Sequence, residues 1–319
     1  MLARRCVRTC VWLGVAASAV LALAAGIGAA AIPDRARGAT AQPAASETIA
    51  YSACTRYSEA NGEVNCMRRG VFRIRLDGSG RRFLAPDASD PEWSRDGRRL
   101  AFAGRGGIWV ARADGSGRRR VTRAPRRGLD DEPSWAPDGR RIVFHREWER
   151  NEELDLTVDL YVLDLRTGRV ERLTHSPDNW EYDPDWSPDG RQIVFGRGEG
   201  DADDGIFLLE LGSGLTTRLA RGGLLATPRW SPDGRRLAYA AGSGIVVVGR
   251  DGKDRRMLLR QRSVSALSWS PDGSRIAYTR IVGEGRQAER LFVVRRDRRR
   301  GARLVVRGGH EPDWRPAAD

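Results

Sequence analysis

Histidine and cysteine, the residues that most often carry catalysis and bind transition metals, are scarce in this chain. The 319 residues include three histidines and four cysteines. The sequence also lacks the Gly-x-Ser-x-Gly motif of serine hydrolases, the His-Glu-x-x-His zinc motif and any Cys-x-x-Cys pair. We therefore expect no enzymatic activity and no resident cofactor. The histidines His145, His175 and His310 are expected in loops, where such residues are usually solvated; the alternative is that they converge as metal ligands.

A ten-residue motif that begins with tryptophan recurs along the chain. A typical copy reads Trp-Ser-Pro-Asp-Gly-Arg followed by an apolar run. The copies begin 42, 51, 44, 39 and 45 residues apart. Self-similarity at such a period indicates one supersecondary unit, repeated and stacked. The repeat tryptophans, which we expect to pack between neighbouring units, are Trp93, Trp135, Trp186, Trp230, Trp269 and Trp314.

Each repeat predicts four antiparallel strands. The Pro-Asp-Gly sequence is typical of a tight turn, because proline presets φ and glycine accepts a left-handed conformation. A short apolar strand such as 193–195 follows the turn, and a third strand such as 206–211 precedes a second Gly-containing turn. A fourth, shorter strand completes the unit. Four strands per repeat predict an all-β fold, a β-propeller of four-stranded antiparallel blades.

The two ends of the repeat region complement each other. A strand at 49–51 has no tryptophan motif before it, and Trp314 has no strand after it. We predict a six-bladed ring over residues 48–316, closed by N- and C-terminal strands that share one blade, which leaves no free sheet edge. The expected blades are 49–85 with 310–315, 87–123, 129–174, 180–220, 224–260 and 264–306.

The first 47 residues differ from the repeats. Three arginines precede an apolar run over 11–32, the pattern of an export signal. The run is also long enough to span a bilayer, so residues 1–32 are either a signal peptide or an N-terminal membrane anchor. Residues 33–47 are predicted to be a flexible tether. Either reading places the propeller outside the cytoplasm, in the periplasm, in the cell envelope or secreted, and any membrane contact would be made through this segment.

Two cysteines, Cys54 and Cys66, lie outside the N-terminal segment. They flank a polar, glycine-containing stretch that is expected to be a loop between the first two strands. Because an exported chain meets an oxidising environment, we predict a disulfide between them, with two free thiols as the alternative.

Charge is distributed unevenly along the repeats. The formal net charge is +13, and arginines gather in the two turns of each blade. We interpret this basic end as an arginine-rich soluble surface; the alternative is contact with anionic lipid or cell-wall polymer. Nucleic acid is not an expected partner, since basic and aromatic residues are not interleaved.

The loops at the other end of the blades are acidic. The longest insertion, 145–159, is expected to overhang this mouth. One hypothesis is that a monomeric protein binds a protein or peptide partner here; the other is that the acids only keep the surface solvated. The candidate partner-binding residues are Asp130, Asp131, Glu132, Trp148, Trp180, Glu181, Asp183, His310 and Glu311.

One acidic loop resembles a weak calcium site. Closely spaced carboxylates at Glu199, Asp201, Asp203 and Asp204 supply the oxygen ligands that calcium prefers. The spacing does not follow an EF-hand, because Asp204 stands where that loop needs glycine. The alternative is a solvated loop without metal.

The repeated motif, with proline two residues before each of five tryptophans, resembles the TolB-type propeller repeat, which is similar to the WD repeat. These prolines are Pro91, Pro133, Pro184, Pro228 and Pro312. The resemblance covers 49–316 and implies a six-bladed, exported interaction scaffold. We accordingly expect a non-catalytic protein that binds a protein or peptide through its acidic loop face. The alternatives are a propeller enzyme or ligand- or glycan-binding protein with a metal or carboxylate site at the mouth, and a membrane-anchored sensor.

Overall fold

The computed structural model describes residues 47–60, 63–149, 156–176, 179–198, 204–221, 227–283, 288–297 and 301–316. The chain separates into two units, Met1–Gln42 and Pro43–Asp319. The first unit, and with it the predicted signal or anchor and most of the tether, lies outside the described residues. Within the described residues there is no helix that is long and apolar enough to cross a membrane.

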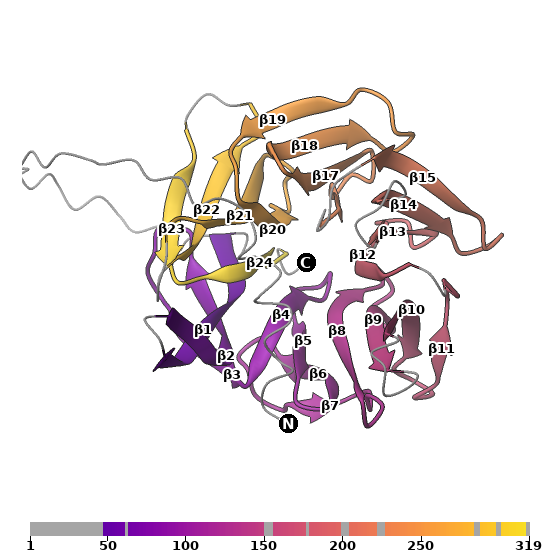
Figure 1. Ribbon diagram of the computed structural model, residues 1–319, viewed down its shortest axis with the longest axis horizontal. Coiled ribbons are helices and arrows are strands. Elements are labelled where there is room, and N and C mark those ends of the chain that lie inside the picture. The colour runs from indigo at the N-terminus through magenta and orange to yellow at the C-terminus, as the bar shows by residue number, and fades with distance from the viewer. Residues whose placement is uncertain are drawn as a thin grey trace, which may run out of the picture. The chain divides into compact units, whose positions relative to one another are not determined.

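The described part of the second unit is a ring of six four-stranded antiparallel sheets (Figure 1). This confirms the predicted fold class, including the blade shared by the two ends of the repeat region. Blade 1 contains β24 (His310–Trp314), β1 (Thr48–Ala60), β2 (Glu63–Arg75) and β3 (Arg82–Pro86). Blade 2 contains β4 (Ala88–Trp93), β5 (Arg99–Gly104), β6 (Gly107–Arg112) and β7 (Arg119–Arg120).

The other four blades follow in chain order. Blade 3 contains β8 (Gly128–Trp135), β9 (Arg141–Glu149), β10 (Leu156–Asp164) and β11 (Val170–Arg172). Blade 4 contains β12 (Glu181–Trp186), β13 (Gln192–Arg197), β14 (Gly205–Glu210) and β15 (Thr216–Arg221). Blade 5 contains β16 (Arg229–Trp230), β17 (Arg236–Ala241), β18 (Gly244–Gly249) and β19 (Arg256–Arg260). Blade 6 contains β20 (Val264–Trp269), β21 (Arg275–Ile281), β22 (Glu289–Arg295) and β23 (Arg303–Arg307).

The turn after each tryptophan folds as its sequence predicts. In blade 5 the Ser231 hydroxyl donates to Asp233 at 2.6 Å and accepts the backbone N–H of Arg236 at 3.0 Å. Gly234 takes a φ of 65°, a left-handed conformation that favours glycine. Because the serine, aspartate and glycine each satisfy a different part of the turn, the motif recurs with little variation.

Each of the six repeat tryptophans packs between two blades. Trp93, for example, lies in a cluster with Ala50 and Val71 of blade 1, and Trp269 lies in one with Ile245 of blade 5. All six tryptophans are buried, with 2–6% of their surface exposed. A large apolar ring at the same position in every blade therefore builds the hydrophobic contacts that join each sheet to the preceding one.

Hydrogen bonds reinforce five of the six blade junctions. The side chain that precedes one tryptophan accepts the backbone N–H of the tryptophan in the next blade. The acceptors are Glu92 for Trp135 at 2.9 Å, Ser134 for Trp186 at 3.3 Å, Asp185 for Trp230 at 2.6 Å, Ser268 for Trp314 at 3.2 Å and Asp313 for Trp93 at 2.7 Å. At the sixth junction the residue before the tryptophan is Arg229, which has no acceptor side chain; its carbonyl accepts the Trp269 indole N–H at 3.2 Å, as the Glu92 carbonyl accepts that of Trp135.

The first hairpin is longer than the sequence pattern predicts. Residues 55–60 and 63–65, expected in a loop, belong to two strands that pair out to Ala60 and Glu63. Among the pairings of this sheet, β24 reaches β1 only as far as Ser52, and β3 pairs with β2 only from Gly70 to Arg73. Within the described residues, the hairpin beyond these points is a two-stranded ribbon that pairs with no third strand.

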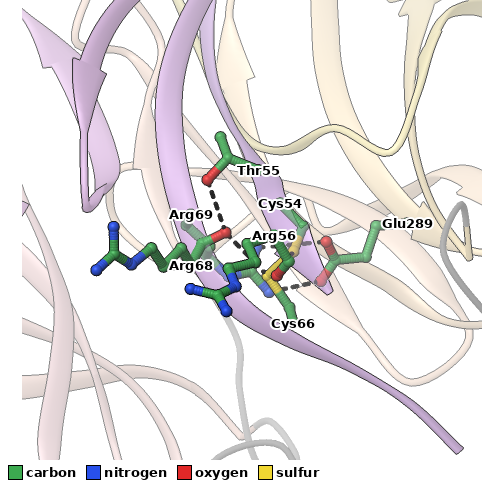
Figure 2. The surroundings of a disulfide bond; sticks show 7 residues. All are labelled: Cys54, Thr55, Arg56, Cys66, Arg68, Arg69 and Glu289. Carbon is green, nitrogen blue, oxygen red and sulfur yellow. Dashed lines mark hydrogen bonds and ion pairs between the residues drawn. A yellow bond between two sulfur atoms is a disulfide. The ribbon is translucent and has the colours of Figure 1, made fainter. Parts of the chain in front are cut away.

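A disulfide joins Cys54 and Cys66 across this ribbon (Figure 2), with Cα atoms 5.7 Å apart. The Thr55 hydroxyl donates to the carbonyl of Arg68 at 3.1 Å beside it. An ion pair of 2.9 Å between Arg69 and Glu289 ties the ribbon to blade 6. Covalent and ionic links thus hold a ribbon that has no neighbouring strand to support it.

Removal of β24 should open the ring. A chain that ends at residue 309 loses Trp314 and the Asp313–Trp93 hydrogen bond, and it exposes the edge of β1. We expect a large fall in the thermal unfolding temperature and concentration-dependent association, because an unpaired sheet edge attracts other chains. Calorimetry and size-exclusion chromatography measure both. A chain that ends at 316 serves as the control; equal unfolding temperatures for the two would contradict the closure.

Loss of the disulfide should destabilise the protein moderately. The crosslink closes a short loop, with a sequence separation of 12 residues. Loop-closure entropy then predicts that Cys54→Ser combined with Cys66→Ser lowers the unfolding free energy by about 2–3 kcal/mol. Urea denaturation of the oxidised protein and the double variant measures this difference. An unchanged midpoint would show that the ribbon does not unfold together with the ring.

Candidate functional site

The innermost strands of the six blades surround the centre of the ring (Figure 1). A cavity of about 450 Å³ at this centre, termed the central channel, is lined by residues of all six blades. The lining extends past the tryptophans to prolines of the repeat turns, among them Pro137, Pro188 and Pro232. The sequence places candidate sites only at the loop end, but this cavity follows the inner strands toward the turn end as well.

One tier of channel residues stands three positions before the repeat tryptophans. Four of these residues are acids, namely Asp90, Glu132, Asp183 and Glu311, and each has a positive φ of 48–52°. The inner strands shift register at this point, as a β-bulge does. Neighbouring blades are joined here too: Glu311 accepts the N–H of Asp90 at 2.8 Å, and Glu132 accepts that of Asp183 at 2.6 Å.

A second tier consists of the residues directly before each tryptophan. It contributes the acids Glu92, Asp185 and Asp313, together with Arg229. With the first tier, seven carboxylic acids and two arginines, Arg95 and Arg229, line the cavity. The channel therefore carries an excess of acidic groups, although the whole chain is strongly basic.

Burial of these acids changes their titration. Burial, followed by the nearby carboxyls of Asp313 and Asp185, raises the pKa of Glu92 well above its ordinary value. Burial likewise raises the pKa of Asp185, and it raises the pKa of Asp313 to about 7. Burial and the neighbouring Asp131 raise the pKa of Asp90. The channel centre therefore retains protons at pH values where an exposed carboxylate has lost them.

Arg229 supplies the counter-charge at the channel centre. Its guanidinium lies 3.4 Å from Asp183. Burial alone would lower the pKa of Arg229, but Asp183, Asp185 and Glu92 outweigh it and raise that pKa. These carboxylates therefore stabilise one permanent cation at the channel centre.

Two of the predicted partner-binding residues lie inside blades. Asp130 is buried and forms an ion pair with Arg146 at 2.6 Å, and Glu181 is buried and forms one with Arg197 at 2.6 Å. The guanidinium of Arg197 also lies over the ring of Phe207. These carboxylates hold neighbouring strands together and are not presented at the surface.

Other predicted residues do converge on the channel. Glu132, Asp183 and Glu311 line the cavity. His310 lies beside Glu311, with Nδ1 and Oε1 2.7 Å apart. Burial lowers the pKa of His310, but the carboxylates of Glu311 and Glu289 raise it more, so its net shift is upward. The Glu311 side chain also accepts the Ser52 hydroxyl at 2.7 Å.

The remaining predicted partner-binding residues lie near the channel or in the loops. Asp131 is half-buried, and its carboxylate accepts the N–H of Glu132 at 3.0 Å. Trp148 is half-buried near the end of β9, and Trp180 is 36% exposed just before β12. The expected 145–159 loop is largely paired strand, because Glu149 pairs with Leu156; residues 150–155 lie outside the described part.

The predicted metal ligands can be followed only in part. Glu199, Asp201 and Asp203 lie outside the described residues, and Asp204 directly precedes β14. In the part of the chain that is described, no group of three or more histidine, cysteine, aspartate or glutamate side chains has the arrangement of a metal site. His145 is buried, with Nδ1 2.7 Å from Glu132, and His175 lies in the connection after β11.

Sequence reasoning missed the second tier. Glu92, Asp185, Asp313 and Arg229 were not singled out, although all stand directly before a repeat tryptophan. Superposition of the repeat copies would have shown this position to vary among glutamate, serine, aspartate and arginine. A varying polar residue beside an invariant tryptophan is the signal that was available.

Residues 91–318 match the family profile described as the TolB β-propeller domain, PD40. The chain belongs to the TolB β-propeller family. No curated protein matches the chain.

Solved structures share the fold of this TolB-family propeller at low sequence identity. TolB from Acinetobacter baumannii aligns with a TM-score of 0.68 and 22% identity, over 85% of this chain and 67% of that one. A manganese complex of oligogalacturonate lyase aligns with a TM-score of 0.55 and 16% identity, over 75% of this chain and 71% of that one. A chain of a nidogen/laminin complex aligns with a TM-score of 0.63 and 11% identity, over 85% of this chain and 100% of that one. At these identities the likeness concerns the fold alone.

The raised pKa of Asp313 predicts a pH-dependent stability. The unfolded aspartate loses its proton near pH 3.8 and the folded one near 7, so the folded state binds more protons between these values. The contribution of Asp313 to the unfolding free energy is complete below pH 3.8 and is lost as the pH rises through 7. Between pH 4.5 and 7.5 the unfolding free energy of the wild type should therefore fall by on the order of 2 kcal/mol relative to that of Asp313→Asn. Urea denaturation at both pH values tests this, and a constant difference between the proteins would refute it.

Proposed function

We propose that this TolB-family propeller is an exported, non-catalytic scaffold that binds a protein or peptide partner by receiving its basic side chains in the central channel. The observation that carries the proposal is the cavity of about 450 Å³ lined by seven acids and two arginines. Lysine and arginine side chains match such a site in charge, and they can donate hydrogen bonds to several carboxylates at once.

The geometry of the carboxylates supports binding in preference to proton-transfer chemistry. Glu92, Asp185 and Asp313 each accept the backbone N–H of a tryptophan in the next blade. These bonds fix the position of each carboxylate and leave its second oxygen or remaining lone pairs for a ligand. A rigid ring of acceptors is a preformed recognition site, and we include the absence of a resident cofactor in the proposal.

The N-terminal sequence and the family support the location. The arginines and the apolar run over 11–32 have the pattern of an export signal or anchor. Membership of the TolB β-propeller family agrees with a protein that works outside the cytoplasm. We propose that the folded ring acts there as a monomer, in the periplasm, in the cell envelope or after secretion.

Binding of a cation should release protons from the channel. The probe is an N-acetylated tetra-arginine peptide, titrated into the full-length protein by isothermal calorimetry at pH 6 and pH 8. Glu92, Asp185 and Asp313 have raised pKa values, so they are more ionised at the higher pH. We expect affinity at least about threefold higher at pH 8, with proton release detected at pH 6 from buffers of different ionisation enthalpy.

Matched variants show whether the channel is responsible. Glu92→Gln with Asp185→Asn removes two channel charges but keeps oxygen acceptors for the tryptophan N–H groups. Glu171→Gln with Glu210→Gln removes two exposed charges from outer strands. Loss of binding in the channel variant alone supports the proposal. Equal weakening in both, or no binding by wild type at either pH, overturns it.

A further inference from the structure

A second cavity lies at the turn end of blades 5 and 6. Its volume is about 520 Å³, and its lining comes from the two turns of blade 5 and the end of β22. Four arginines and three aspartates contribute to it, and the arginines are Arg235, Arg236, Arg250 and Arg296. No residue of this groove lines the central channel.

The repeat shows that one of these arginines has a different environment from its counterparts. The residue six positions after the repeat tryptophan is Arg99, Arg141 and Arg275 in blades 2, 3 and 6. Each of these guanidinium groups lies 4.5–5.0 Å from the ring centre of the next blade's tryptophan. These three side chains are half-buried as a result. In these three blades, the arginine six positions after the tryptophan therefore helps to join neighbouring blades by packing over an aromatic ring.

In blade 5 the residue at this position is Arg236, and it does not pack over the tryptophan of the next blade. Its side chain is exposed and lines the groove, and among the described residues it has no contact over an aromatic ring. In blade 4 the position is Gln192, which accepts a hydrogen bond from Arg250 at 3.2 Å. Both departures from the repeat thus involve an arginine that lines this groove.

The acids of the groove are partly occupied by their own turns. Asp233 accepts the Ser231 hydroxyl at 2.6 Å and the N–H of Arg235 at 3.0 Å. Asp251 accepts the N–H of Lys253 at 3.0 Å. Within the described residues none of the four groove arginines forms an ion pair with a carboxylate, and only Arg250 donates its guanidinium to another side chain, that of Gln192.

We propose that this groove binds a phosphate-bearing anion. Guanidinium groups present two parallel N–H donors that match the oxygens of a phosphate. Arg235 and Arg236 come from one turn, Arg250 from the next, and Arg296 from the neighbouring blade, so they can surround a phosphate from several sides. The three aspartates oppose any anion, so binding requires that the four arginines outweigh them. The phosphate belongs to a lipid headgroup or to a soluble compound.

Two probes distinguish these sources. Pyrophosphate is titrated calorimetrically into the full-length protein at low salt. Vesicles of phosphatidylglycerol are compared by flotation with vesicles of phosphatidylcholine, because the apolar N-terminal run would bind both kinds and only their ratio reports on the headgroup. Binding of pyrophosphate assigns a soluble phosphate to the groove. A preference for phosphatidylglycerol without pyrophosphate binding assigns a lipid headgroup.

The groove variant is Arg235→Gln with Arg236→Gln, and a second variant is Arg296→Gln. The matched control is Arg98→Gln with Arg140→Gln, which removes two exposed charges from the equivalent turns of blades 2 and 3. We expect the groove double variant to lose about tenfold in phosphate affinity, since two charge-assisted hydrogen-bonding groups are removed. The Arg296 variant should also weaken binding, and the control should retain it.

Three results would overturn the proposal. Wild type that binds neither probe shows no phosphate site. Equal loss in the groove variant and the control shows general attraction to a basic surface. Binding that survives in both groove variants places the phosphate elsewhere. All the altered side chains lie on the surface or at the groove, and circular dichroism and thermal unfolding confirm that each variant is folded before binding is measured.

Discussion

The structure depends on a hydrogen bond between neighbouring blades. A backbone N–H on an inner strand is buried and must be satisfied, and in five of six junctions a side chain from the preceding blade satisfies it. That side chain stands directly before the repeat tryptophan, whose ring fills the space between the same two sheets. One short sequence segment therefore supplies both the apolar packing and the polar link, and the ring closes when Asp313 in β24 accepts the N–H of Trp93.

The acidic character of the channel follows from this constraint. A position that must accept an N–H favours carboxylates and hydroxyls, which explains Glu92, Ser134, Asp185, Ser268 and Asp313. Six blades bring these positions together around one axis. Burial and mutual repulsion then raise the pKa values of the acids, and Arg229 is the one member of this tier that supplies positive charge. Assembly of the ring thus gathers seven carboxylic acids around one cavity.

The departures from the repeat are as informative as the repeat itself. Arg229 stands where other blades have an acceptor, and at its junction the Arg229 carbonyl accepts the Trp269 indole N–H. Arg236 leaves the tryptophan stack that its counterparts form and lines a groove at the turn end. In blade 1 the strands run past their neighbours as a ribbon that a disulfide holds together.

Much of the fold follows from sequence alone, because the signals are local. The Pro-Asp-Gly turns, the short apolar strands and the spacing of the tryptophans determine four-stranded units and their number, and the unmatched ends at Ile49 and Trp314 determine the shared blade. The site depended on tertiary structure. In a sequence, a solvated acid cannot be distinguished from one that forms a buried ion pair. Only the folded chain shows that Asp130 and Glu181 are buried against arginines. It also shows that Glu132, Asp183 and Glu311 line the channel. The channel residues lie about 40 residues apart in sequence, and only closure of the ring brings them within range of one ligand.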